Sequence, residues 1–163
     1  MAVLPIRPLP DSVLRQKAKR VRDIDSSIQR LIDDMLETMR HVSGVGLAAP
    51  QVGVPLRVIV LQLDDEEEPL VLINPEVVRR SGEREVEEGC LSIPGYRGEI
   101  KRSLSLTVKG RDRRGKEIRV KATELLAQAL EHELDHLNGV LYVDRLESRD
   151  KLHKFEPERQ PEP

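Results

Sequence analysis

Apolar residues recur at helical spacing in the segment between residues 26 and 44. The apolar positions are Ile28, Leu31, Ile32, Met35, Leu36 and Met39. This spacing places them on one face of an amphipathic helix. Ser26 and Gln29 have the pattern of a capping box, and Gly44 stands where a helix end favours a left-handed residue. The pattern therefore predicts one helix near the N-terminus.

The middle of the chain has the pattern of loops and strands. The segment GVGLAAPQVG, residues 44–53, is too rich in Gly and Pro for a helix and is expected to be a shaped loop. Strand patterns occupy residues 57–63, residues 70–78, the start of residues 83–95, and the alternating pair 103–112 and 116–123. An acidic turn separates the first two, and Arg-Arg-Gly joins the last two into a predicted hairpin.

A second helix is predicted from Thr123, a suitable N-cap, through Leu137, where Asn138 and Gly139 stop it. Strands that mostly precede a late helix indicate an α+β fold, with antiparallel or mixed sheets packed around that central helix. We expect residues 1–150 to form a single catalytic domain. We expect residues 151–163, which contain three prolines and little apolar surface, to be a disordered tail.

Composition narrows the class of protein. The chain has 163 residues, 38% hydrophobic and 34% charged, and no run approaches the ~20 apolar residues of a membrane helix. The start of the chain lacks the apolar core of a secretory signal, so we expect a cytoplasmic protein without membrane contact. Net charge is −2. Residues 101–121 carry nine basic and two acidic side chains, but no interleaved aromatic residue for stacking, so we expect a solvated face and no direct nucleic-acid binding.

The second helix carries candidate chemistry in the sequence HELDH. His132 and His136 are four residues apart, so their side chains project from one face and can hold one metal ion. Glu133 lies about 100° round the helix, suited to take a proton from the water that the ion activates. A plain amphipathic helix with two exposed histidines would give the same five residues.

A catalytic site of this kind needs a third protein ligand. Tyr142 stands where one protease pattern, HExxHxxGxxH, places its last histidine. Glu156 and Glu158 are further candidates, but both lie in the proline-rich tail. The single cysteine, Cys90, cannot form an intramolecular disulfide and could be a buried apolar residue, a reactive thiol or a ligand. As a thiolate it would complete a Cys-His-His set.

Three segments together resemble the signature motifs of bacterial peptide deformylases. They are GVGLAAPQVG at 44–53, EGCLS at 88–92 and HELDH at 132–136, and the resemblance runs from about Asp11 to Leu146. The resemblance implies an enzyme that removes the formyl group from the N-terminal formyl-methionine of newly synthesised polypeptides. It also implies one divalent metal bound by Cys90, His132 and His136, Fe2+ in the cell, with Zn2+, Ni2+ or Co2+ as substitutes.

The same resemblance assigns roles to further residues. The Gln51 amide and the backbone N–H of Leu91 would hold the oxyanion that develops on the formyl oxygen, while Glu133 carries protons. The peptide would bind as an added strand. The residues expected to bind substrate are Gly44, Val45, Gly46, Glu88, Arg97, Leu125 and Ala129. Gln128 is expected to face the site, and Asp135 with Arg102 to form an ion pair behind the ligand helix.

The chain departs from the family pattern at its C-terminal end, and the sequence leaves two alternative functions open. Some family members end in a long basic helix that docks on the ribosome, whereas this chain finishes soon after Leu146, so only a transient ribosome contact, through residues 101–121, is expected. A structural metal-binding module would need a fourth protein ligand, yet His41 and His153 lie in the first helix and the tail. A zinc metalloprotease would need its third ligand downstream.

Overall fold

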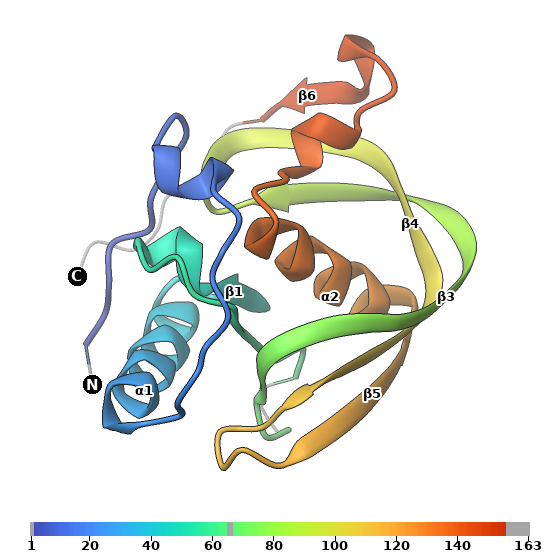
Figure 1. The fold of residues 1–163 in the computed structure, drawn as a ribbon. Helices are drawn as coiled ribbons and strands as arrows, with labels where there is room; N and C mark the ends of the chain where they lie inside the picture. The colour runs from blue at the N-terminus through green and yellow to red at the C-terminus, as the bar shows by residue number, and fades with distance from the viewer. Residues whose placement is uncertain (1, 65–66, 156–163) are drawn as a thin grey trace.

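A computed structural model describes residues 2–64 and 67–155 (Figure 1). Its helices are α1 (Ser26–His41) and α2 (Glu124–Leu137), with short 3-10 helices η1 (Ser12–Arg15), η2 (Ala49–Val52), η3 (Tyr142–Arg145) and η4 (Arg149–Lys151). Its strands are β1 (Gly46–Ala48), β2 (Val58–Leu61), β3 (Leu70–Cys90), β4 (Ile93–Arg111), β5 (Glu117–Thr123) and β6 (Leu152–Lys154). The predicted α+β class is confirmed.

The strands form one antiparallel sheet in the order β1-β2-β3-β4-β5, and β6 pairs with β4. The strands β3 and β4 are long and bend at register shifts, one of them between Glu88 and Cys90. The resulting ribbon curls past α2, which lies in the middle of the molecule with β1, β3, β4 and β5 around it (Figure 1). Twisted strands with bulges curve in this way. The predicted hairpin of β4 and β5 is confirmed.

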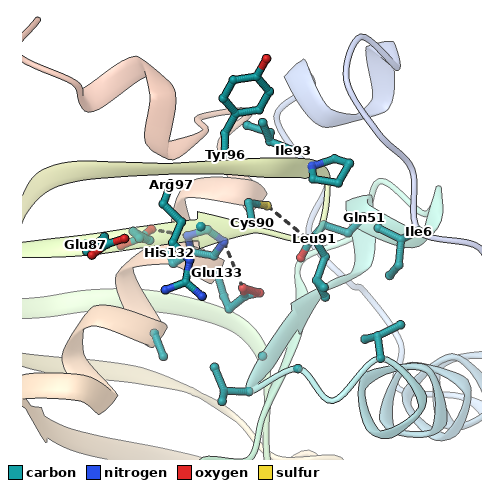
Figure 2. Close-up of a pocket in the computed structure, with 18 of the residues that line it drawn as sticks. Ile6, Gln51, Glu87, Cys90, Leu91, Ile93, Tyr96, Arg97, His132 and Glu133 are labelled. Carbon is teal, nitrogen blue, oxygen red and sulfur yellow. Dashed lines mark hydrogen bonds and ion pairs between the residues drawn. The ribbon is translucent and has the colours of Figure 1, made fainter. Parts of the chain in front are cut away.

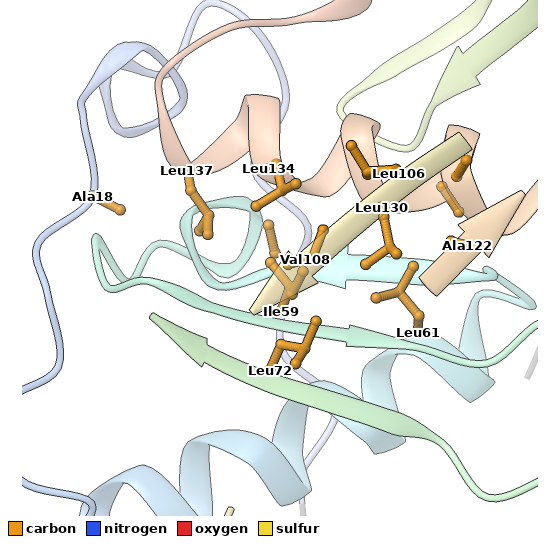
Figure 3. Close-up of a cluster of buried hydrophobic side chains, with 13 residues drawn as sticks. Ala18, Ile59, Leu61, Leu72, Leu106, Val108, Ala122, Leu130, Leu134 and Leu137 are labelled. Atoms are coloured by element: carbon orange, nitrogen blue, oxygen red, sulfur yellow. The ribbon is translucent and has the colours of Figure 1, made fainter. Parts of the chain in front are cut away.

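Successive side chains of β2 point alternately into two hydrophobic cores. Ile59 and Leu61 pack with Leu130, Leu134 and other apolar residues against α2 (Figure 3). Val58 and Val60 point to the opposite face and pack in the cluster that contains the apolar side of α1. Successive side chains in a strand face opposite sides, so a buried strand with helices on both faces is apolar at every position. The two cores fix α2 relative to the sheet.

The ends of α1 differ from the prediction. Asp25, not Ser26, is the N-cap, and its carboxylate accepts hydrogen bonds from the N–H groups of Ser27 (3.0 Å) and Ile28 (3.2 Å). The capping-box prediction was wrong because the side chain of Gln29 bonds Arg113 instead. Ser43 adopts the left-handed conformation predicted for Gly44, with φ of 53°. The prediction for α2 is confirmed, with Thr123 as N-cap and Asn138 as C-cap.

Two segments expected to be irregular are partly regular. Residues 44–53 contain β1 and η2, because Gly46–Ala48 pair with β2 and Pro50 fits the first turn of a 3-10 helix. Residues 152–154, expected to be disordered, instead form β6 on β4, and Leu152 packs against the small cluster around Tyr142. The rest of the predicted disordered tail, residues 156–163, lies outside the described residues and includes Glu156 and Glu158.

Candidate metal centre and active site

Three side chains from two distant parts of the chain converge beside α2. Cys90 ends β3, while His132 and His136 stand one turn apart on α2. The Nε2 atoms of the two histidines are 3.1 Å apart, and the Sγ atom of Cys90 is 3.3 Å from Nε2 of His136. Within the described residues, these three form the one group of side chains whose ligand atoms could hold a metal ion, all within 4.8 Å of one another.

The chemistry of this donor set fits a divalent metal. Each of the three atoms carries a lone pair, and atoms of this kind at such short separations repel unless they share a cation. Burial lowers the pKa of His132, but its contacts with Cys90 and Glu88 raise it well above the usual value. Burial, together with the nearby His132, lowers the pKa of His136 well below it. A thiolate and two imidazoles at these separations suit a borderline divalent ion.

A buried ionic network orients His132. Its Nδ1 atom contacts the Glu88 carboxylate. Arg102 also donates to both Glu88 oxygens, at 2.9 and 2.6 Å, and donates to Asp135 at 2.7 Å. Arg145 completes the network by donating to both oxygens of Asp135. The predicted ion pair of Asp135 and Arg102 is confirmed. Such partners fix the ring of a metal-binding histidine.

Glu88, which was predicted to bind substrate, lines the pocket and also supports the histidine ligand. Both of its oxygens are engaged by Arg102 and His132, and the residue is buried. Burial alone would raise the pKa of Glu88, but the hydrogen bonds from His132 and Arg102 lower it to about 2. A carboxylate held in this way stays ionised. Sequence reasoning could not identify these partners, because Arg102 comes from β4 and His132 from α2.

Glu133 combines burial with an oxygen that has no partner. Its Oε1 atom lies 3.7 Å from Nε2 of His132, and its Oε2 atom is buried without a hydrogen bond. Burial raises the pKa of Glu133 to about 7. A Cβ atom at Gly46 would lie 3.2 Å from Cγ of Glu133, so a side chain at this position would crowd the carboxylate. The arrangement is suited to proton transfer near neutral pH.

Gln51 is held rigidly beside the three donors. Its Oε1 atom accepts a hydrogen bond from the N–H of Ala48 at 3.0 Å, which turns its Nε2 group toward Oγ of Ser92 (3.4 Å) and Sγ of Cys90 (3.7 Å). Figure 2 shows the Gln51 amide joined to the Cys90 sulfur by a dashed line, with Leu91 beside them. Ser92 is fully buried and was missed by sequence reasoning, although it is the last residue of the EGCLS segment.

These groups open onto a pocket of about 600 Å³ (Figure 2). Of the residues predicted to bind substrate, the pocket brings together Gly44, Val45, Gly46, Glu88, Arg97, Leu125 and Ala129. Val45 and Leu125 are 48% and 56% exposed, which is high for apolar side chains. Gln128 lines the pocket as predicted. Ile6 and Phe155 also line it and were missed, because they come from the two ends of the described chain.

Comparison with known proteins gives one consistent result. The family model described as Polypeptide deformylase matches residues 3–152. The chain is 58% identical over 158 residues to the peptide deformylase of Dehalococcoides mccartyi strain CBDB1, covering 97% of this chain and 95% of that protein.

Two solved structures agree with this match. The crystal structure of a peptide deformylase from Legionella pneumophila matches with a TM-score of 0.89 and 49% identity, over 92% of this chain and 89% of that chain. The peptide deformylase from Synechococcus elongatus, crystallised in complex with actinonin, matches with a TM-score of 0.88 and 47% identity, over 91% and 83%. None of the helices in the described residues has the length and apolar character needed to span a membrane.

Proposed function

Because the chain belongs to the polypeptide deformylase family and is a metal-dependent enzyme that acts on N-formyl peptides, we propose a division of roles among its pocket residues. The observation that carries the proposal is the buried carboxylate of Glu133, with one oxygen unpartnered, beside the cluster of Cys90, His132 and His136. The reaction adds water to the formyl carbon, breaks the bond between that carbon and the methionine nitrogen, and releases formate and a free amine.

Cys90, His132 and His136 hold the divalent metal. When bound, such an ion acts as a Lewis acid that lowers the pKa of water toward ~7 and polarises a carbonyl group. The donor set is compatible with several borderline ions. We propose Fe2+ as the ion used in the cell, with Zn2+, Ni2+ or Co2+ as substitutes. Metal analysis of protein purified without oxygen tests this choice.

Glu133 transfers the proton. Its Oε2 atom is free to accept a proton from the attacking water and to return it to the departing methionine nitrogen. A carboxylate with a pKa of about 7 can do both at neutral pH, because its two protonation states have similar free energies there. The close approach of Gly46 keeps this carboxylate in place.

Gln51 and Leu91 stabilise the oxyanion. The hydrogen bond from Ala48 leaves the Gln51 amide with its N–H donors aimed at the metal ligands, so little reorganisation is needed during the reaction. The backbone N–H of Leu91 is the second donor in this assignment. A neutral amide serves well because it donates to the developing charge without competing as a metal ligand.

The peptide lies along Gly44, Val45 and Gly46 as an added strand, and its methionine side chain contacts Val45, Leu125 and Ala129. The exposed apolar surface of Val45 and Leu125 supports this placement, as does their common position on one pocket. A tight space between the metal ligands, Gln51 and Leu91 would accept the hydrogen of a formyl group and exclude the methyl of an acetyl group. We expect actinonin, which the Synechococcus relative binds, to compete for this pocket.

A transient ribosome contact and a cytoplasmic location complete the proposal, with a single catalytic domain that includes β6 and Phe155. A second pocket of about 700 Å³, which shares no residue with the first, brings Arg20 and Arg22 beside Arg111 of the basic hairpin. Replacing the three arginines with glutamine should weaken co-sedimentation with ribosomes at low salt without changing hydrolysis of short peptides. Equal co-sedimentation would exclude this face.

The decisive experiment separates the enzyme from a protease. Metal-loaded protein should release formate from formyl-Met peptides, act weakly on acetyl-Met peptides and leave long unformylated chains intact. Gln51→Leu should lower turnover by ~10²-fold with little change in peptide binding, since one oxyanion donor is lost. Internal cleavage of unformylated chains that disappears in Glu133→Ala would replace this proposal with the metalloprotease alternative.

A further inference from the structure

The C-terminal strand adds an aromatic side chain to the pocket. β6 pairs antiparallel with the start of β4, and the N–H of Phe155, the residue after β6, donates to the carbonyl of Gly95 at 2.9 Å. Phe155 lines the same pocket as His132 and Glu133, and it is 38% exposed. In Figure 1, β6 lies along one end of β4. A segment more than fifty residues away in sequence therefore forms part of the pocket rim.

Phe155 contacts the one arginine that reaches into this pocket. The guanidinium carbon of Arg97 lies over the Phe155 ring, 5.2 Å from its centroid. Figure 2 shows Arg97 extending from β4 toward His132. Within residues 2–64 and 67–155, no carboxylate forms an ion pair with Arg97. At the mouth of the pocket, the Arg97 guanidinium therefore contacts an aromatic ring, and its N–H groups are available to donate to a ligand.

We propose that Phe155 is a positioning residue that holds Arg97 at the pocket mouth, where Arg97 receives a carboxylate side chain of the peptide just downstream of methionine. The inference rests on the proposed function for the peptide substrate. An exposed arginine loses side-chain entropy when it is fixed, and this loss opposes binding. Contact with the ring restricts Arg97 before the peptide binds, so less of this cost falls on binding.

A second charged residue on the rim of the pocket, Glu87, also affects which peptides bind. Glu87 lines the same pocket and makes no ion pair among the described residues, while its backbone carbonyl accepts a hydrogen bond from Gln128. The Glu87 carboxylate repels an acidic side chain of the peptide. Binding of acidic peptides therefore depends on attraction by Arg97, and hence on the position in which Phe155 holds Arg97. Neutralising Glu87 should therefore increase the preference for an acidic residue, whereas loosening Arg97 should decrease it.

The test compares matched formyl peptides that differ only in glutamate or glutamine, at the second or the third residue, with amidated C-termini. At one of these positions the parent enzyme should prefer glutamate by about two- to fivefold in kcat/KM, the size expected of an exposed ion pair. The difference should appear in KM and should decrease with added salt. Arg97→Gln should abolish it, and Glu87→Gln should enlarge it.

Conservative variants of Phe155 distinguish a role of its aromatic ring from a role of apolar packing alone. Phe155→Tyr keeps an aromatic face and should keep the preference, whereas Phe155→Leu keeps apolar bulk in the strand and should lose it. Lys154→Gln is the matched control, because it removes an exposed positive charge from β6 and leaves the Phe155 ring that contacts Arg97 unchanged. This control should leave the glutamate preference unchanged. In NMR spectra of the parent protein, the side-chain resonances of Arg97 should be shifted by the ring and should return to ordinary values in Phe155→Leu.

Three results would overturn the inference: no glutamate preference in the parent at either position, the same preference in Phe155→Leu as in the parent, or an equal loss in Lys154→Gln. All of these are measured on peptides that are deformylated, so they leave the proposed function intact. Failure to release formate from any peptide would instead remove the proposed function, and this inference with it.

Discussion

Replacing Arg102 with methionine tests the network that supports the metal ligands. The Arg102 side chain is 2% exposed and donates to both oxygens of Glu88 and to Asp135. In Arg102→Met, Asp135 keeps Arg145, whereas Glu88 keeps His132 and a longer hydrogen bond from Gln128 at 3.5 Å. The variant therefore leaves one buried carboxylate without its main counter-charge, and burying an uncompensated charge is costly.

The magnitude follows from the pKa of Glu88. Its lowering from 4.5 to about 2 corresponds to about 3 kcal/mol, at ~1.36 kcal/mol per unit, and this free energy is shared between Arg102 and His132. Breaking a buried pair typically costs ~3–5 kcal/mol. We therefore expect Arg102→Met to lower the free energy of unfolding by about 3 kcal/mol, which shifts Tm by roughly 6–12 °C for a chain of this size.

Urea denaturation and thermal melting should be measured at several pH values. The pKa of Glu88 is lowered by folding, so its contribution is present above about pH 4.5 and is lost as pH falls toward 2. In Arg102→Met the loss should begin at higher pH. The double variant with Glu88→Gln should recover part of the stability, because the uncompensated charge is gone. Lys101→Met, at an exposed ion pair with Glu147, is the control and should change little. A loss below ~1 kcal/mol in Arg102→Met would refute the reasoning.

Three further outcomes are expected. Glu133→Ala should retain one metal ion per chain by elemental analysis yet lower turnover by ~10²–10⁴-fold, because the carboxylate carries protons and is not a ligand; loss of the metal would contradict this role. Gly46→Ala should lower kcat more than it raises KM, because its Cβ would displace Glu133. If the variant has the same kcat and KM as the parent, the carboxylate can move without loss of function. Glu124→Gly should raise the free energy of unfolding by about 1 kcal/mol, since Glu124 has a φ of 52°; denaturation that shows no gain would indicate that this conformation is not strained.

Local sequence determined the features that depend on neighbouring residues. The bounds of α2 follow from helical periodicity between Thr123 and Asn138, and the position of His132 and His136 on one face follows from the geometry of a helix. The hairpin of β4 and β5 follows from alternation around a turn. Cys90 as third ligand came from motif resemblance and from the lack of a suitable donor downstream, and the structure brings its Sγ atom to the histidines. Apart from the approach of Cys90 to the histidines, these features require few contacts between distant segments.

Tertiary structure alone decided which distant groups became partners. Nothing near Glu88 in sequence predicts that its oxygens meet Arg102 and His132, because the three come together through the pairing of β3 with β4 and the packing of α2. The residues around Phe155 have the composition of a disordered tail, yet β6 forms because the edge of β4 offers unpaired backbone groups. The free energy of such contacts depends on residues that are distant in sequence. A local pattern of residues therefore does not predict them.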